Sequence, residues 1–408
     1  MIEVESIQRR VVRVLIVAQI LGGIGLGATV SVGALLASEV SGSPAWSGMA
    51  ATMSTLGAAL LAVPLARAAQ ARGRRVALSI GSIIAALGAV LATCAAALGS
   101  FPLLLVGLAL AGAGSATNLQ ARFAATDLAL LLHRARQLSL VVWSTTIGAV
   151  LGPNLIEPGE TIGAAIGLPT LTGPFLFTVA AQVAAMLVYF LGLRPDPLLT
   201  ALSRASTRDG APPRHGFATL RVNSLARYAV VAVALSHATM VAMMSMTPVH
   251  LYEHGATLTI VGFALSLHIA GMYALSPVFG WLADRWGRIP TILFGQALLV
   301  AALLTAWVGS QSQFWVVVSV ILLGLGWSAS TIAGSTLVAE SAPVDDRAGL
   351  QGVSDLLMNS TAAVGGALAG PVLAVVGYSG LGVVCLLLVA VVAGWSILRM
   401  ASPARVAN

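Results

Sequence analysis

The chain carries the sequence GWLADRWGR at residues 280–288, a short charged segment between two long apolar stretches. The last two residues of this segment, Gly287-Arg288, have a counterpart 214 residues earlier at Gly73-Arg74. A second motif repeats at nearly the same spacing, because Gly148-x-x-x-Gly152-Pro153 recurs 218 residues later as Gly366-x-x-x-Gly370-Pro371. Two independent markers at nearly one offset indicate an internal duplication.

The stretches that flank these motifs are long and apolar. Of the 408 residues, 58% are hydrophobic and 9% are charged, and the mean hydropathy is +0.94. A helix that crosses a bilayer needs about 20 apolar residues, so the sequence predicts an all-α integral membrane protein with twelve transmembrane helices. The predicted spans are 11–37, 45–66, 75–98, 101–125, 137–156, 173–193, 225–249, 258–283, 290–309, 313–339, 349–375 and 379–399.

Arginine placement predicts the orientation of these spans. All 21 basic residues are arginines, and they gather in every second gap between spans, while the other gaps hold glutamates or no charge. Basic loops stay in the cytoplasm, so we expect a multi-pass protein of the inner (plasma) membrane with both termini cytoplasmic. The net charge of +7 is dispersed over many short loops, which argues against a nucleic-acid partner.

One arginine-bearing gap is longer than the others and divides the chain. Residues 194–224 are rich in Pro, Arg, Ser and Gly and predict a cytoplasmic linker. On either side lie an N-terminal half at 1–193 and a C-terminal half at 225–408, each with six predicted spans. Two pseudo-symmetric six-helix bundles of this kind are how many secondary transporters are built.

At this point the motifs resemble those of a known family. Residues 280–288 resemble the loop signature of the major facilitator superfamily, G-x-L-a-D-r-x-G-r, and Gly148-x-x-x-Gly152-Pro153 resembles the span-5 signature of its proton-coupled drug antiporters. The resemblance implies a twelve-span efflux carrier with charged clasps at a cytoplasmic gate. The expected gate residues are Gly73, Arg74, Arg122, Asp127, Gly280, Asp284, Arg285, Gly287 and Arg288.

The chain departs from the family pattern in three places. Gln70 stands where the first-half loop would carry an aspartate, and Leu108 stands where such exporters often carry an arginine in span 4. Span 1 has no acidic residue within its membrane portion. The usual coupling site of a drug exporter therefore cannot be transferred to this sequence.

Ionisable and polar residues at membrane depth are functional candidates, because burying a charge there costs roughly 3 kcal/mol. We expect Asp355, together with His237 or His268, to carry a coupling proton, since an unperturbed histidine has a pKa of about 6.5. Asp355 has Asn359 one turn away on the same helical face. Two alternatives stay open: Asp355 pairs with Arg72 or Arg74 as a gate latch, or it stabilises its helix N-terminus. For each histidine, the alternative to carrying a proton is a structural hydrogen bond between helices.

Other residues are candidates for packing or for substrate contact. Small residues four apart allow helices to approach closely, so Gly148, Gly152 and Pro153 predict either a kinked seal between the halves or ordinary packing. Arg122 is expected to pair with Asp127 or to reach the membrane interface. The polar candidates for a central cavity are Gln19, Asn118, Gln120 and Tyr273, beside the methionines Met240, Met243, Met244 and Met246.

These features predict a secondary active transporter. Our leading hypothesis is a proton-driven antiporter that exports a small, moderately hydrophobic or cationic molecule by alternating access. The alternatives are a proton-coupled symporter that imports a metabolite and a receptor or scaffold without transport. The sequence has no P-loop, nucleophile elbow or metal-site spacing, so we expect no enzyme activity, cofactor or metal. The expected partners are the lipid bilayer, protons and a small-molecule substrate, and we expect a monomer.

Overall fold

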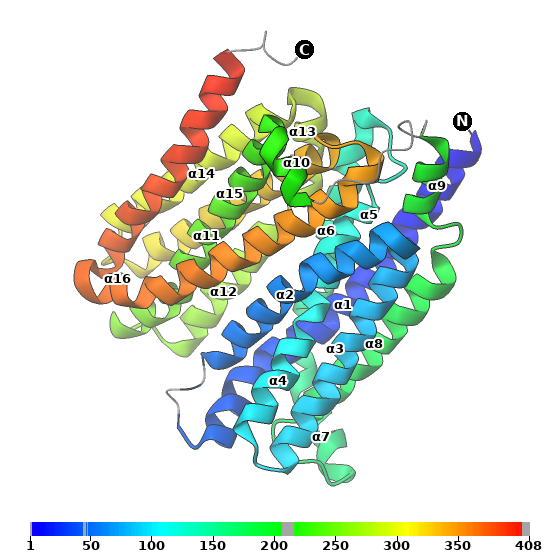
Figure 1. Ribbon diagram of the computed structural model, residues 1–408. Coiled ribbons are helices and arrows are strands. Elements are labelled where there is room, and N and C mark those ends of the chain that lie inside the picture. Colours follow the sequence, from blue (N-terminus) through cyan, green and yellow to red (C-terminus); the bar gives the residue numbers. More distant parts are fainter. Residues whose placement is uncertain (1, 44–45, 47, 206–215, 402–408) are drawn as a thin grey trace. The chain divides into compact units, whose positions relative to one another are not determined.

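The computed structural model describes residues 2–43, 46, 48–205 and 216–401, and throughout these ranges the regular structure is helical (Figure 1). The middle of the predicted linker and Arg405 lie outside the described residues. The elements are α1 Ile2–Ser41, α2 Met49–Arg72, α3 Arg74–Ala97, α4 Phe101–Ala111, α5 Ala113–Ala124, η2 Leu131–His133, α6 Arg134–Leu151, η3 Pro153–Leu155, α7 Ile156–Ala165, α8 Gly173–Gly192, α9 Pro197–Arg204, α10 Gly216–Val222, α11 Ser224–Glu253, α12 Leu258–Tyr273, α13 Ser276–Trp286, α14 Arg288–Val308, α15 Gln313–Glu340 and α16 Val344–Ala401.

The helices are consistent with twelve membrane spans. Ten helical segments of the described chain are long and apolar enough to cross a bilayer. Helix α6 is not among them, and its first turn carries Arg134 and Arg136. Helix α16 counts once although its 58 residues would extend about 87 Å if straight. Gly377, with φ 70° and ψ 178°, interrupts it, so α16 supplies two spans.

Several predicted boundaries differ from the observed ones. The fourth predicted span is divided at Gly112 into α4 and α5, and the eighth is divided between α12 and α13. The predicted linker contains the short helices α9 and α10, and the predicted gap at 157–172 contains most of α7. Asp196 explains where α9 begins, because its carboxylate accepts the backbone N–H groups of Leu198 and Leu199.

By contacts, the chain forms two compact units. Unit 1 comprises Met1–Leu130, Ser144–Thr219 and Ala342–Leu356, and unit 2 comprises Leu131–Trp143, Leu220–Ser341 and Leu357–Asn408. Each unit therefore consists mostly of one sequence half, together with the first turns of one helix from the other half. The start of α6 belongs to unit 2, and the start of α16 belongs to unit 1. The division into halves at 193 and 225 stays a prediction.

Small residues bring the helices of each unit together. In unit 1, a Cβ atom on Gly88 of α3 would lie 2.3 Å from the backbone nitrogen of Ala111, so α3 and α4 touch through their backbones. In unit 2, a Cβ on Gly295 of α14 would lie 2.3 Å from Ser330 Oγ on α15. Close backbone approach provides the van der Waals contact that holds helices together in a lipid environment.

Opposite charges lie at opposite ends of the unit-1 helices. One end holds the arginine-rich turn between α2 and α3, where the Asp196 carboxylate accepts the backbone N–H of Arg75 at 2.7 Å. At the other end, the Glu160 carboxylate accepts the backbone N–H of Leu171 at 2.9 Å, and Thr170 donates to Glu39 Oε1 at 2.7 Å. The arginine-rich turn and the glutamates are thus separated by the length of α2, about 36 Å for 24 residues.

Candidate functional site

The repeated Gly-Arg pair makes the same turn in each unit. Gly73 ends α2 with φ 86° and ψ 168°, and Gly287 ends α13 with φ 101° and ψ 162°. Positive φ values are accessible to glycine because it lacks a Cβ atom. In both places the next residue is the first of a new helix, Arg74 for α3 and Arg288 for α14.

Arg74 forms a buried ion pair within unit 1. Its Nε lies 2.8 Å from Asp127 Oδ2 and its Nη2 lies 3.3 Å from Asp127 Oδ1, and both side chains are fully buried. Two parallel hydrogen bonds make this a bidentate arginine–carboxylate pair, the stronger form of the interaction. The Arg74 Nη2 also donates to Gln351 Oε1 on α16. A single guanidinium therefore connects α3, the end of α5 and the start of α16.

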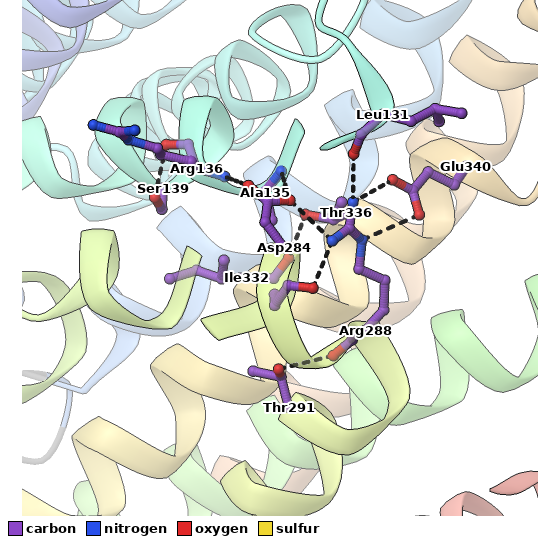
Figure 2. A network of polar contacts seen from close by, with 12 residues as sticks. Leu131, Ala135, Arg136, Ser139, Asp284, Arg288, Thr291, Ile332, Thr336 and Glu340 are labelled. Carbon is purple, nitrogen blue, oxygen red and sulfur yellow. Dashed lines mark hydrogen bonds and ion pairs between the residues drawn. The ribbon is translucent and has the colours of Figure 1, made fainter. Parts of the chain in front are cut away.

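Arg288 repeats this arrangement in unit 2 (Figure 2). Its Nε and Nη2 donate to the two carboxylate oxygens of Glu340 at 3.2 and 2.8 Å, and Nη2 also donates to the Leu131 carbonyl at 2.8 Å. Glu340 follows Asp127 by 213 positions, almost the offset of the Gly-Arg pair. The duplication therefore includes the carboxylate partner, which the sequence analysis missed and the repeat offset would have located.

Asp284 stabilises the start of α6. Its carboxylate accepts the backbone N–H groups of Ala135 and Arg136 at 3.2 and 2.9 Å and pairs with Arg288 Nη1 at 2.9 Å (Figure 2). A carboxylate at a helix N-terminus is stabilised by the unpaired N–H groups and the helix dipole. Gly280 permits this approach, since a Cβ there would lie 2.2 Å from Ser139 Oγ.

Arg285 was expected to join Asp284, but the structure places it elsewhere. Its guanidinium lies over the ring of Trp281, with the central carbon 5.4 Å from the ring centroid. Residues 281 and 285 are one turn apart on the same face of α13, so the aromatic ring is the neighbour that the side chain meets. Arg288 is therefore the arginine paired with Asp284.

Gln70 occupies the first-half position that corresponds to Asp284. Its Nε2 donates to the Asp345 carbonyl at 2.6 Å, in the first turn of α16. That turn already contains two carboxylates, Asp345 and Asp346, whereas the first turn of α6 contains two arginines. An amide at position 70 therefore holds α16 without adding a third negative charge. This difference in the helix starts gives a physical reason for the departure from the family motif.

Arg122 forms a second buried ion pair in unit 1, with Asp355. The Nη2 and Oδ1 atoms are 2.7 Å apart, and the side chains are 2% and 0% exposed. This pair joins α5 of the first sequence half to α16 of the second. The positions at the repeat offset of 214 are Thr336 and Val141. Unlike the Arg74 and Arg288 pairs, this ion pair is not part of the duplication.

These pairings differ from the expected ones. From the sequence, pairing of Asp355 with Arg72 or Arg74 was one open alternative, and Arg122 was expected to pair with Asp127 or to reach the membrane interface. The partners are exchanged because Asp127 follows the end of α5, where the chain turns and the carboxylate reaches the first residue of α3. Arg122 remains within α5, and its side chain reaches α16 instead.

In unit 2, His237 and Tyr273 meet through Trp327, a residue that the sequence analysis did not single out. The indole Nε1 of Trp327 donates to His237 Nδ1 at 2.7 Å, and the Tyr273 ring contacts the Trp327 ring edge-on, with centroids 5.8 Å apart. His268 is buried separately, and its Nδ1 lies 2.8 Å from the Val320 carbonyl oxygen. The sequence signal for Trp327 was an aromatic residue in the middle of a predicted span.

Three polar residues proposed for a central cavity make structural contacts in unit 1. Gln19 donates to Thr145 Oγ1 at 2.9 Å, and Gln120 donates to the Ala62 carbonyl at 3.0 Å. Asn118 packs against α1, where a Cβ on Gly22 would lie 2.5 Å from its Oδ1. Asn359 is buried and belongs to unit 2, while Asp355 belongs to unit 1.

The span-5 motif packs α6 against α1, which is in the same sequence half. A Cβ on Gly148 would lie 2.5 Å from the Ile20 carbonyl oxygen, and one on Gly152 would lie 2.6 Å from Gly27 Cα. Pro153 begins the short helix η3. The corresponding Gly370 is open, since a Cβ there would meet no described atom within 4 Å. The contacts of these glycines support the alternative of close packing within the first half, and the seal between the halves stays a prediction.

Comparison with known proteins agrees with this architecture. The family model of the Major Facilitator Superfamily matches residues 15–255 and 229–408. The MFS-type transporter YdeG of Bacillus subtilis (strain 168) is 40% identical over 400 residues, which cover 96% of this chain and 93% of YdeG. The riboflavin transporter RfnT of Brucella anthropi is 28% identical over 371 residues, which cover 90% of this chain and 89% of RfnT.

A solved structure shows the same fold. The outward-facing structure of a bacterial homologue of the iron transporter ferroportin, with soaked iron, has a TM-score of 0.77 and 13% sequence identity. The similarity covers 96% of this chain and 99% of that chain. With the family match over both halves and the identity to YdeG, these findings establish that the chain is a multi-pass membrane transporter that belongs to the major facilitator superfamily.

Proposed function

We propose that this protein is a proton-driven antiporter of the plasma membrane that exports a small, moderately hydrophobic or cationic molecule by alternating access. The observation that carries the proposal is the Arg122–Asp355 ion pair, which is buried, joins the two sequence halves and is not duplicated. Alternating access needs contacts between the halves that form in one state and break in another. An ion pair with a titratable member is such a contact.

Proton coupling follows from the chemistry of this pair. A buried carboxylate is stable in its charged form only beside a partner charge. A proton that reaches Asp355 from the outer side neutralises the carboxylate and releases Arg122. When the cytoplasmic side opens, water reaches Asp355 and the proton leaves into the cytoplasm. The proton thus moves inward during each cycle, as antiport with an exported molecule requires.

The duplicated pairs form the frame of the proposed cytoplasmic gate. Arg74–Asp127 and Arg288–Glu340 each fix the turn between two helices within one unit. Asp284 and Gln70 each hold the first turn of a helix from the other sequence half, α6 and α16. We assign this side to the cytoplasm because it carries the arginines. Neutralising Asp284 should therefore slow transport more than it weakens substrate binding.

The substrate class follows from which charges are present at membrane depth. Arg122 is 2% exposed, and Asp355 already compensates its charge. An anionic substrate would lack a free guanidinium partner. In unit 2 the side chains around Met240 and Met243 are apolar, which suits a molecule with a hydrophobic or aromatic part. The similarity to RfnT makes riboflavin a reasonable first compound to assay.

Flux in inverted membrane vesicles tests the proposal. Vesicles that contain the full chain are given an acidic interior and assayed with riboflavin, cationic dyes and a panel of antibiotics. Export predicts accumulation of one compound inside the vesicles, and accumulation should disappear with an ionophore that removes the gradient. Uptake only into right-side-out vesicles with acid outside would instead establish the importing symporter. Binding without any flux would establish the receptor or scaffold.

A further inference from the structure

An aromatic cluster in the middle of unit 2 holds a histidine in a defined protonation state. The cluster consists of His237 on α11, Tyr273 on α12 and Trp327 on α15, and Trp327 is 4% exposed. The indole nitrogen of Trp327 lies 2.7 Å from His237 Nδ1, and the ring centroids of these two residues are 5.8 Å apart.

The indole N–H can only donate a hydrogen bond, because the nitrogen lone pair belongs to the aromatic ring. The His237 Nδ1 atom therefore accepts, and it accepts only while it carries no proton. The imidazole in this structure is accordingly neutral, with its single proton on Nε2. Trp327 thus identifies both the tautomer and the charge of His237.

We propose that His237 Nδ1 binds a proton, and that binding of this proton breaks the hydrogen bond from the Trp327 indole. Nδ1 is the ring nitrogen still able to take a proton, and a protonated Nδ1 would face the indole N–H as donor against donor. Proton binding and the Trp327–His237 hydrogen bond are therefore mutually exclusive. Since Tyr273 contacts the same indole ring, displacement of Trp327 also changes the surroundings of Tyr273. This inference rests on the proposed proton coupling and gives it a second site.

His268 provides the contrast. Its Nδ1 lies 2.8 Å from the Val320 carbonyl oxygen, which can only accept, so Nδ1 carries the proton. A further proton would add at Nε2, which has no hydrogen-bond partner among the described residues. The bond to Val320 persists in both charge states. Protonation of His268 thus requires no rearrangement, whereas protonation of His237 does.

Other titratable groups of unit 2 are few near His237. The helices packed against α11 are α12, α14 and α15, together with the part of α16 that contacts Ala234 and Ala238. Between their ends these helices carry His268, Tyr273, Asp355, Tyr378 and Cys385, while α11 itself adds Tyr228, His250 and Tyr252. Asp355 precedes Thr361 by six residues, about 9 Å along α16, and is paired with Arg122. Their other charged residues lie near the helix ends: Arg227, Glu253, Arg288, Glu340, Asp345, Asp346, Arg347 and Arg399. Glu340 is thirteen residues beyond Trp327, about 20 Å along α15.

Spectra of the full chain in lipid nanodiscs test the inference without any substrate. The protein is labelled with ¹⁵N-histidine and titrated with acid, and the His237 signals are identified by their loss in His237→Gln. The wild type should show an unprotonated Nδ1 at neutral pH. In Trp327→Phe an aromatic ring is kept but the hydrogen-bond donor is lost. The equilibrium constant for protonation of His237 should therefore rise about fivefold, which corresponds to the net free energy of one hydrogen bond. The matched control His268→Gln should leave the His237 titration unchanged.

The indole provides an independent signal. The ultraviolet resonance Raman difference between wild type and Trp327→Phe isolates the N–H band of Trp327, which should report loss of the hydrogen bond as His237 is protonated. In His237→Gln the amide oxygen still accepts but does not titrate, so the band should no longer depend on pH. An unchanged His237 titration in Trp327→Phe would overturn the inference, as would a band that remains pH-dependent in His237→Gln. Neither result depends on the flux assay, so the inference and the proposed function fail separately.

Discussion

Replacing Asp355 with asparagine should destabilise the protein by more than any exposed charge deletion. The Asp355 carboxylate is fully buried and lies 2.7 Å from Arg122, which is 2% exposed. Removing one member leaves the other charge buried without its partner, at a cost of about 3–5 kcal/mol in the free energy of unfolding. Arg122→Gln should cost a similar amount, because it removes the positive charge that lies 2.7 Å from the buried carboxylate.

The double variant Arg122→Gln/Asp355→Asn makes the prediction sharper. Two neutral amides can hydrogen-bond to each other, so the double variant should lose less than the sum of the two single losses, by a coupling free energy of about 2–3 kcal/mol. Equilibrium unfolding in mixed micelles measures all four proteins. Glu5→Gln is the matched control, since the Arg9–Glu5 pair is 64% and 66% exposed and should contribute less than about 1 kcal/mol. Simple additivity of the two single losses would refute the reasoning.

Three further predictions concern the gate and the glycine contacts. Gln70→Asp should lower the unfolding midpoint, because its carboxylate would face Asp345 and Asp346, and Asp345→Asn should partly restore it; an increase in stability would contradict our explanation of Gln70. Gly148→Ala should cost about 1–3 kcal/mol, since its Cβ would lie 2.5 Å from the Ile20 carbonyl oxygen, whereas Gly370→Ala should be tolerated. Equal losses would show that the two motifs pack alike. Asp127→Asn should cost more than Glu340→Gln, because Arg288 keeps its direct ion pair with Asp284 while the hydrogen bond that Arg74 keeps is to the neutral Gln351. Unfolding free energies of both variants decide this.

The sequence predicted the features that depend on interactions between residues close together in the chain. Span-length apolar stretches and the short charged turns between them depend on residues close together in the sequence, and the structure has helices and turns at these places. The repeat offset also related residues far apart in the sequence, since Gly73-Arg74 and Gly287-Arg288 make the same turn. An offset one residue shorter leads from Asp127 to Glu340, so the sequence could have predicted the duplicated clasp.

What the sequence could not predict depends on how distant helices pack. Arg122 had nearby Asp127 as a plausible partner, yet it meets Asp355, which is 233 residues away. Trp327 had no distinguishing neighbour in the sequence, and its role follows only from its contact with His237 on another helix. The glycine motifs show the same limit, because Gly152 is tightly packed while Gly370 is open. Repeated residues thus do not guarantee repeated contacts.

Proton-coupled flux through Asp355 tests the central claim most directly. Wild type and Asp355→Asn are reconstituted in proteoliposomes, and transport of the compound found in vesicles is measured both under a pH gradient and as exchange without one. We predict that Asp355→Asn loses gradient-driven accumulation and keeps exchange, while Glu157→Gln, an exposed carboxylate substitution, keeps both. Accumulation by Asp355→Asn at the wild-type rate would contradict the account.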